Sequence, residues 1–156
     1  MKLAELILRY AWVMFILITC ANAAIWAKRS RPHIARNPEL APGYRKLIRG
    51  LLLYGNLPWV VMGIGILFGG VATVFDFLDP RSGIFALVLL GVIVVLWVLG
   101  TYWLLFAGGA EELIRYPGLM QEPIHRPWII KAWWLLCLSG GIAGLWEALR
   151  LGARVH

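Results

Sequence analysis

Charged residues are scarce in this chain of 156 residues: they make up 15% of it, where an average soluble domain carries about 25%. This shortage excludes a disordered chain, a soluble coiled coil and an ordinary water-soluble domain. Cysteine is also scarce, and two residues exclude a disulfide-dense scaffold and a four-cysteine zinc or iron–sulfur site. Hydrophobic residues, by contrast, reach 61%, and the mean hydropathy is +0.76. This balance indicates a polytopic membrane protein.

Residues that ligate cofactors are missing from the apolar segments. His33, His125 and His156 all lie outside these segments, so haem held by paired histidines is not expected. Cys20 and Cys137 belong to different segments and form no C-x-x-C motif, which disfavours a quinone-linked disulfide enzyme. No apolar segment has a central carboxylate of the kind that drives proton-coupled export. We therefore expect no cofactor and no metal site.

Four segments are long and apolar enough to cross a bilayer, for which a helix needs about 20 mostly apolar residues. The predicted spans cover residues 10–27, 51–75, 83–106 and 128–149. The sequence therefore predicts an all-α integral membrane protein, in which residues 1–156 form a single domain of four transmembrane helices.

The first span has an alternative interpretation as a secretory signal, because Lys2 and Arg9 precede an apolar run that ends near Ala21-Asn22-Ala23. Glu5 interrupts the positive region with which such a signal begins. We therefore expect the segment to be a retained span.

Two linkers are long enough to matter, a basic one at 28–50 and an interfacial one at 107–127. In the second linker, residues 111–114 are expected to form a short helix that ends at Pro117-Gly118. Its acidic residues are expected to pair with arginines of the first linker as a structural clasp; they are Glu111, Glu112 and Glu122.

Basic residues collect in the first linker, and positive loops resist translocation. We therefore expect both linkers in the cytoplasm and both termini outside (N-out/C-out), in a cell membrane of the bacterial inner-membrane type. Near anionic lipid each basic residue is worth about 1 kcal/mol; the expected lipid contacts are Lys28, Arg29, Arg31, Arg45, Lys46 and Arg49. An anion or nucleotide site is the alternative. Nucleic acid is not an expected partner, because Tyr44 is the linker's only stacking group.

Polar residues of the spans are expected to share one depth, about 5–8 Å below the cytoplasmic edge, because a helix rises about 1.5 Å per residue. Pro58 frees the carbonyl of Tyr54 within the second span, and Asn56 is close enough to satisfy that carbonyl or to line a path beside it. The predicted polar layer consists of Asn22, Tyr54, Asn56, Pro58, Thr101 and Lys131. The alternative is ordinary interhelical hydrogen bonding, worth about 0.6 kcal/mol per pair, with Lys131 reaching the headgroups.

Two glycine pairs are spaced for close helix packing: Gly65 with Gly69, and Gly140 with Gly144. Four spans bury little surface by themselves, so we expect a homo-oligomer.

These features favour a self-assembling channel or transport module for small ions or solutes, lined by the kinked second span. The first alternative is a non-catalytic accessory subunit of a larger membrane complex. A less favoured alternative is a small lipid- or phosphate-handling enzyme that uses Glu122, His125 and Arg126.

Overall fold

Four long helices dominate the computed structural model, which describes residues 3–120 and 125–152 and contains no strand within them. Each of the four contains a stretch long and apolar enough to cross a membrane, so the protein is an all-α, multi-pass membrane protein, as predicted. The long helices are α1 (Leu3–Arg36), α2 (Ala41–Phe68), α3 (Ile84–Leu105) and α5 (Pro127–Gly152). Shorter helical elements connect them: η1 (Pro38–Leu40), η2 (Val74–Leu78), η3 (Pro80–Ser82) and α4 (Gly109–Arg115).

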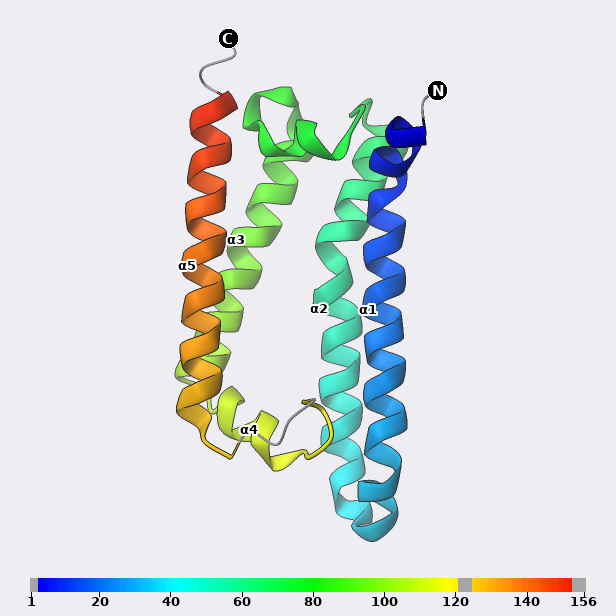
Figure 1. Ribbon diagram of the computed structural model, residues 1–156, viewed down its shortest axis with the longest axis vertical. Helices are drawn as coiled ribbons and strands as arrows, with labels where there is room; N and C mark the ends of the chain where they lie inside the picture. The colour runs from blue at the N-terminus through cyan, green and yellow to red at the C-terminus, as the bar shows by residue number, and fades with distance from the viewer. Residues whose placement is uncertain (1–2, 121–124, 153–156) are drawn as a thin grey trace.

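The long helices form two antiparallel pairs, α1 with α2 and α3 with α5 (Figure 1). The short helix α4 crosses one end of the bundle, which we call the α4 end. The elements η2 and η3 cross the other end, where α1 begins and α5 ends; we call it the terminal end (Figure 1).

The predicted basic linker is a helical hairpin and not an irregular loop. α1 continues to Arg36, and α2 begins at Ala41 after the single turn of η1. The Asn37 side chain caps this turn by accepting a hydrogen bond from the Glu39 amide at 3.1 Å. The hairpin therefore projects past α4 as a continuation of the two spans (Figure 1).

The predicted second span is too long at its C-terminal end. α2 stops at Phe68, and Gly70 adopts a φ of +71°, a left-handed conformation that glycine adopts without strain. Residues 69–73 form the turn into η2, and residues 74–75 belong to η2 itself instead of to the span. The bounds of α3 and α5 differ from the predicted spans by only one to three residues.

Small residues on α2 receive large side chains of α1 and thereby fix the register of this pair. A Cβ atom added to Gly63 would lie 2.7 Å from the Trp12 ring, and one added to Gly55 would lie 3.1 Å from Thr19. Between these two contacts the rings of Phe15 and Trp59 stack at a centroid distance of 4.1 Å. At each contact the two residue numbers add up to 74 or 75. The two antiparallel helices therefore keep a single register along this stretch.

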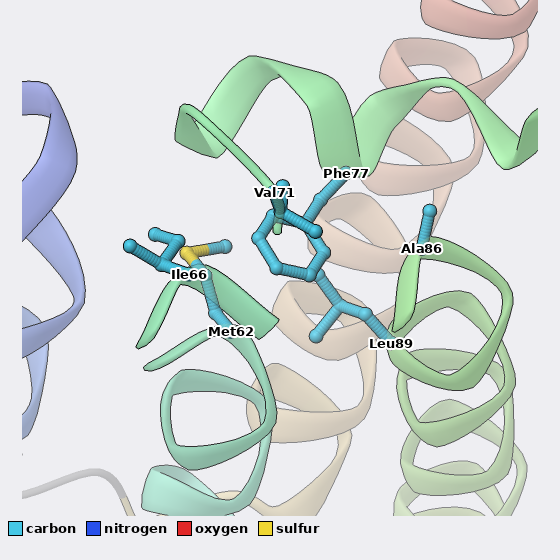
Figure 2. Close-up of a cluster of buried hydrophobic side chains, with 6 residues drawn as sticks. All are labelled: Met62, Ile66, Val71, Phe77, Ala86 and Leu89. Carbon is cyan, nitrogen blue, oxygen red and sulfur yellow. The ribbon is translucent and has the colours of Figure 1, made fainter. Parts of the chain in front are cut away.

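An apolar cluster joins the two helix pairs at the terminal end. Figure 2 shows its six buried side chains converging from α2, the η2 segment and α3: Met62, Ile66, Val71, Phe77, Ala86 and Leu89. The segment is held in place by a capping box, in which the Thr73 amide donates to the Asp76 carboxylate at 2.8 Å. Phe77 can approach α2 closely because Gly65 leaves room for its ring.

Candidate functional site

Two adjacent glutamates of α4 join the helix pairs at the α4 end. Glu112 accepts a hydrogen bond from Lys46 of α2 at 2.8 Å, and Glu111 accepts one from Lys131 of α5 at 2.8 Å. The bond from Lys131 is the main reason why the pKa of Glu111 lies below its usual value of 4.5. The prediction of a clasp between these glutamates and the arginines of the first linker is therefore met only in part. Glu112 pairs with that linker, but through a lysine, Glu111 pairs with α5 instead, and Glu122 lies outside the described residues.

The segment after α4 strengthens this clasp by packing onto the basic hairpin. The buried hydroxyl of Tyr44 donates to the Pro117 carbonyl at 2.7 Å. Tyr116 lies edge-on to the Tyr44 ring at 5.0 Å and covers Gly43 so closely that an added Cβ atom would overlap its hydroxyl. Gly118, with a φ of +84°, brings the chain against His33. The sequence did not predict this packing, because it joins residues far apart in the chain and no local motif indicates it.

The clasp gives a reference level from which the depth of each polar residue can be counted. The register of α1 and α2 places Lys28 level with Lys46. From that level, Asn22 lies about 9 Å deeper into the bundle and Asn56 about 15 Å deeper, at about 1.5 Å per residue.

The polar residues of α3 and α5 lie nearer the α4 end. Lys131 belongs to the clasp itself through its bond to Glu111. Thr101 accepts a hydrogen bond from the Trp134 indole at 3.0 Å, about one turn deeper than Lys131. Among the described residues, no hydrogen bond or ion pair joins any two of Asn22, Asn56, Thr101 and Lys131.

Counted from the clasp, the residues of the predicted polar layer therefore lie at successive depths along the helices and not at a single one. The prediction took Leu51 as the membrane edge of the second span, whereas α2 is helical from Ala41 and its charged level lies at Lys46. Counted from Lys46 instead of Leu51, Asn56 lies about 7 Å deeper along α2, whereas Lys131 lies at the level of the clasp.

Among the described residues of the set, Asn56 is the one with a buried side-chain atom that has no hydrogen-bond partner. Its amide donates to the Leu52 carbonyl at 2.8 Å, so it does not repair the carbonyl of Tyr54 that Pro58 leaves free. Its Oδ1 atom is buried and accepts no hydrogen bond from the described residues. The Tyr54 side chain is exposed and points elsewhere, because residues two apart on a helix differ by about 200°.

A second buried polar atom without a partner lies on the same side of α2. The indole nitrogen of Trp12 donates no hydrogen bond within the described part of the chain. Its ring covers Gly63, which is seven residues, or about two turns, along α2 from Asn56 and therefore on the same face. One unpaired acceptor on α2 and one unpaired donor on α1 thus lie along the face of α2 that carries Asn56 and Gly63, which we call its inner face.

Asn22 differs from Asn56 in being exposed on the surface of α1. No hydrogen bond to its side chain is found in residues 3–120 and 125–152, whereas the neighbouring Thr19 hydroxyl donates to the Phe15 carbonyl at 3.0 Å. Asn22 is therefore the polar side chain that the bundle leaves open to its surroundings.

The two glycine pairs behave differently inside the chain. Gly65 and Gly69 lie against the rings of Phe77 and Phe85, so they admit aromatic side chains and not a second backbone. A Cβ atom added to Gly140 or Gly144 would have no neighbour within 4 Å; it is the adjacent Gly141 that receives the Trp97 ring. Sequence reasoning missed this pairing of glycine with tryptophan, which recurs at Gly63, Gly100, Gly109 and Gly141.

The six predicted lipid-contact residues are all exposed, and they lie on the projecting hairpin: Lys28, Arg29, Arg31, Arg45, Lys46 and Arg49. Of these six residues, Lys46 forms an ion pair with Glu112. The remaining positive charges face the surroundings where the hairpin leaves the bundle.

Two of the three residues of the enzyme hypothesis are described by the structure. His125 and Arg126 are exposed at the start of α5, and Glu122 lies outside the described residues. Within the described ranges, no group of three or more His, Cys, Asp or Glu side chains is arranged to hold a metal ion.

Comparison of the chain with protein-family models, curated proteins and solved structures finds no match.

Proposed function

We propose that the protein is a self-assembling membrane module that lets a small ion or polar solute pass along the inner face of α2. The observation that carries the proposal is the buried, unpaired oxygen of Asn56. The basic hairpin would face the cytoplasm, with both termini on the other side, in a membrane of the bacterial inner-membrane type. The excess of Lys and Arg at the α4 end supports this orientation.

The depth of Asn56 supports a role in passage. The hydrocarbon core is about 30 Å thick, and Asn56 lies about 15 Å from the charged level at Lys46. Counted from Arg49, the nearest charged residue of α2, it lies about 10 Å deeper, so its amide would lie inside the hydrocarbon core. Polar groups at that depth are costly and often mark the paths of ions or substrates.

The missing partner supports the same role. A buried acceptor without a hydrogen bond costs about 1–3 kcal/mol, and leucine at this position would avoid the cost. A small solute that donates a hydrogen bond, or a hydrated cation, would satisfy the Asn56 oxygen. The Trp12 indole would offer a donor about two turns further along the same face.

Flux into liposomes tests the proposal directly. Purified wild-type protein is expected to release a gradient of small ions or solutes, and Asn56→Leu is expected to abolish this flux. Asn56→Gln, which keeps an amide, is expected to retain part of it. Leu53→Ala is the matched control, because Leu53 is exposed on the same helix at nearly the same depth. Equal flux through wild type and Asn56→Leu, with both proteins inserted, would remove Asn56 from the mechanism.

Asn22 favours a second candidate, a non-catalytic accessory subunit of a larger membrane complex. Its exposed amide has no hydrogen-bond partner among the described residues and suits contact with another subunit. This candidate predicts no flux from the purified protein, and a stable partner protein after gentle solubilisation.

A further inference from the structure

We infer that one face of the basic hairpin binds the phosphate group of an anionic lipid, through Arg31 of α1 and through Arg45 and Arg49 of α2. The inference goes beyond the proposed passage of a solute and does not depend on it. It follows from the position of these three arginines on a helical hairpin whose other face is already covered.

The segment after α4 shows which face of the hairpin is covered. On α2 this segment overlies Gly43, and Leu47 is buried in one cluster with Leu119 of the segment. Arg45 and Arg49 each follow one of these two α2 residues by two positions, and residues two apart on a helix point about 200° apart. Both arginines therefore lie on the free face of α2, which they share because they are four residues apart.

The same reasoning places Arg31 of α1 on the free face. Gly118, in the segment after α4, approaches His33 so closely that an added Cβ atom would lie 3.2 Å from the imidazole Nε2. Arg31 precedes His33 by two positions and therefore points away from this contact. The register of α1 and α2 puts Arg31 level with residues 43–44, within about 3 Å of the level of Arg45. Arginines of both helices thus meet on one face.

The charges of these three arginines are not neutralised within the described part of the chain. Residues 28–49 contain seven Lys and Arg residues and one Glu. Of the seven, Lys46 is the one that forms an ion pair among the described residues, and the three arginines are exposed. A guanidinium group matches phosphate with two parallel hydrogen bonds. The free face is therefore suited to a phosphate group.

The arginines lie at the level expected for lipid headgroups. Arg45 and Arg49 are within about 5 Å of the level of Lys46, which belongs to the clasp. Lys131 belongs to the same clasp, and Trp128, three residues before it, is exposed as in the tryptophan belts of membrane interfaces. A headgroup layer is about 5–8 Å thick on each side of the hydrocarbon core. One layer of phosphates can therefore contact both arginines of α2.

The surface beneath the arginines favours a lipid phosphate over a dissolved one. Leu52 follows Arg45 by seven residues and Ala24 precedes Arg31 by seven, so each lies deeper on the same face of its helix. Both are exposed and apolar. A ligand that matches the whole face has a phosphate at the level of the hairpin and an acyl chain below it.

Arg29 provides the matched control. It is exposed, it is level with Arg45 in the register of α1 and α2, and no ion pair involves it among the described residues. It precedes His33 by four residues and therefore lies on the covered side of the hairpin. Loss of its charge is equivalent in amount and level to loss of Arg45, but it occurs on the other face.

Quenching of a fluorophore by lipids with brominated acyl chains tests the site. Cys137→Ala leaves the exposed Cys20 as the single attachment point. Cys20 precedes Arg31 by eleven residues, so it lies on the same face about 16 Å deeper, at the depth of acyl chains. The labelled protein is placed in phosphatidylcholine vesicles that contain a rising fraction of brominated phosphatidylglycerol or of brominated phosphatidylcholine. The ratio of the two quenching efficiencies measures the preference for the anionic lipid.

Wild-type protein is expected to prefer phosphatidylglycerol. Arg45→Gln and Arg49→Gln are each expected to lower this preference about 5-fold, the factor that corresponds to about 1 kcal/mol per basic residue, and Arg29→Gln to lower it less than about 2-fold. Arg45→Lys keeps the charge but not the paired donors, and its preference is expected to lie between those of wild type and Arg45→Gln.

Equal losses for Arg29→Gln and Arg45→Gln would indicate only a general attraction to charged membranes and would overturn the site. Absence of a preference in wild type, its abolition by excess inorganic phosphate, or a soluble acidic protein bound at the arginines would each overturn it as well. Asn56→Leu is expected to leave the preference unchanged, so failure of this site and failure of solute passage are distinguishable.

Discussion

The two ends of the bundle join the same helix pairs by different kinds of interaction. At the terminal end, the apolar side chains of α2, η2 and α3 interlock around Phe77 (Figure 2). At the α4 end, two ion pairs and the hydrogen bond from Tyr44 to Pro117 hold α2, α4 and α5 together. The terminal end therefore depends mainly on one apolar cluster, whereas the α4 end adds ion pairs and a hydrogen bond to two buried apolar clusters of its own, around Tyr44 and around Leu104. Loss of Phe77 should loosen the first end most, and loss of an ion pair should affect only the second.

The largest effect is expected from Phe77→Ala, because it removes a buried ring at the centre of the apolar cluster. Truncation of a buried phenylalanine costs about 3–5 kcal/mol. The loss is measured as the difference in the free energy of unfolding between variant and wild type in mixed detergent micelles, with tryptophan fluorescence as the signal. Phe68→Ala is the control, since the Phe68 side chain is 82% exposed. Equal losses for the two variants would show that the cluster does not hold this end together.

The next largest effect is expected from Gly65→Val. The new side chain would collide with the rings of Phe77 and Phe85, and overpacking of this kind costs about 1–3 kcal/mol. Gly144→Val makes the same change where an added Cβ atom has no neighbour within 4 Å. The free energies of unfolding of the two variants are measured in the same micelles and compared. If Gly144→Val is equally destabilising, that glycine packs against something outside a single chain.

A smaller effect is expected from Tyr44→Phe at the α4 end. The substitution removes only the hydroxyl that donates to the Pro117 carbonyl, and one such bond contributes about 1 kcal/mol. Hydrogen exchange of the amides of residues 113–119 should increase, while exchange in η2 should not change. Tyr54→Phe, at an exposed tyrosine of the same helix, should alter neither. Faster exchange at both ends would contradict the independence of the two ends.

The smallest effect is the pH dependence of the Glu111–Lys131 pair. Because the pKa of Glu111 is lower in the folded protein than its usual 4.5, the unfolded state binds more protons near that pH. The pair's contribution is therefore fully present above about pH 4.5 and is lost as the pH falls through the lowered pKa. Unfolding measured from pH 6 to pH 3 should decline more for wild type than for Glu111→Gln.

Glu39→Gln serves as the control for this titration, because Glu39 is exposed in the η1 turn and no ion pair involves it among the described residues. Its pH profile should follow that of wild type. A wild-type profile that matches Glu111→Gln would mean that the ion pair does not stabilise the α4 end.

Sequence reasoning predicted the four spans and the short helix before Pro117 because length and composition alone determine them. It predicted a basic linker at 28–50, whereas both flanking helices continue through most of that segment despite its three prolines. Pro32 lies in the last turns of α1, Pro38 opens η1 and Pro42 is in the first turn of α2. The first turn of a helix tolerates proline, since the missing amide has no intrahelical partner there.

Less of the candidate site was predictable. The polar residues were identified from their types, but their relative depths depend on the register of α1 with α2 and on the contact between α2 and α4, which the sequence does not specify. The bond from Tyr44 to Pro117 joins residues 73 positions apart, and no local pattern indicates it. The unpaired oxygen of Asn56 likewise depends on which neighbours the fold supplies, and the sequence does not specify them.

The two glutamates of α4 are consecutive, yet their lysine partners belong to two different long helices, α2 and α5. Neighbouring side chains on a helix point about 100° apart, so α4 can contact α2 through Glu112 and α5 through Glu111. A residue inserted between the two glutamates would turn one of them away from its lysine. The two adjacent glutamates thus help to set the distance between α2 and α5 at this end, and a displacement of one helix is transmitted to the other through them.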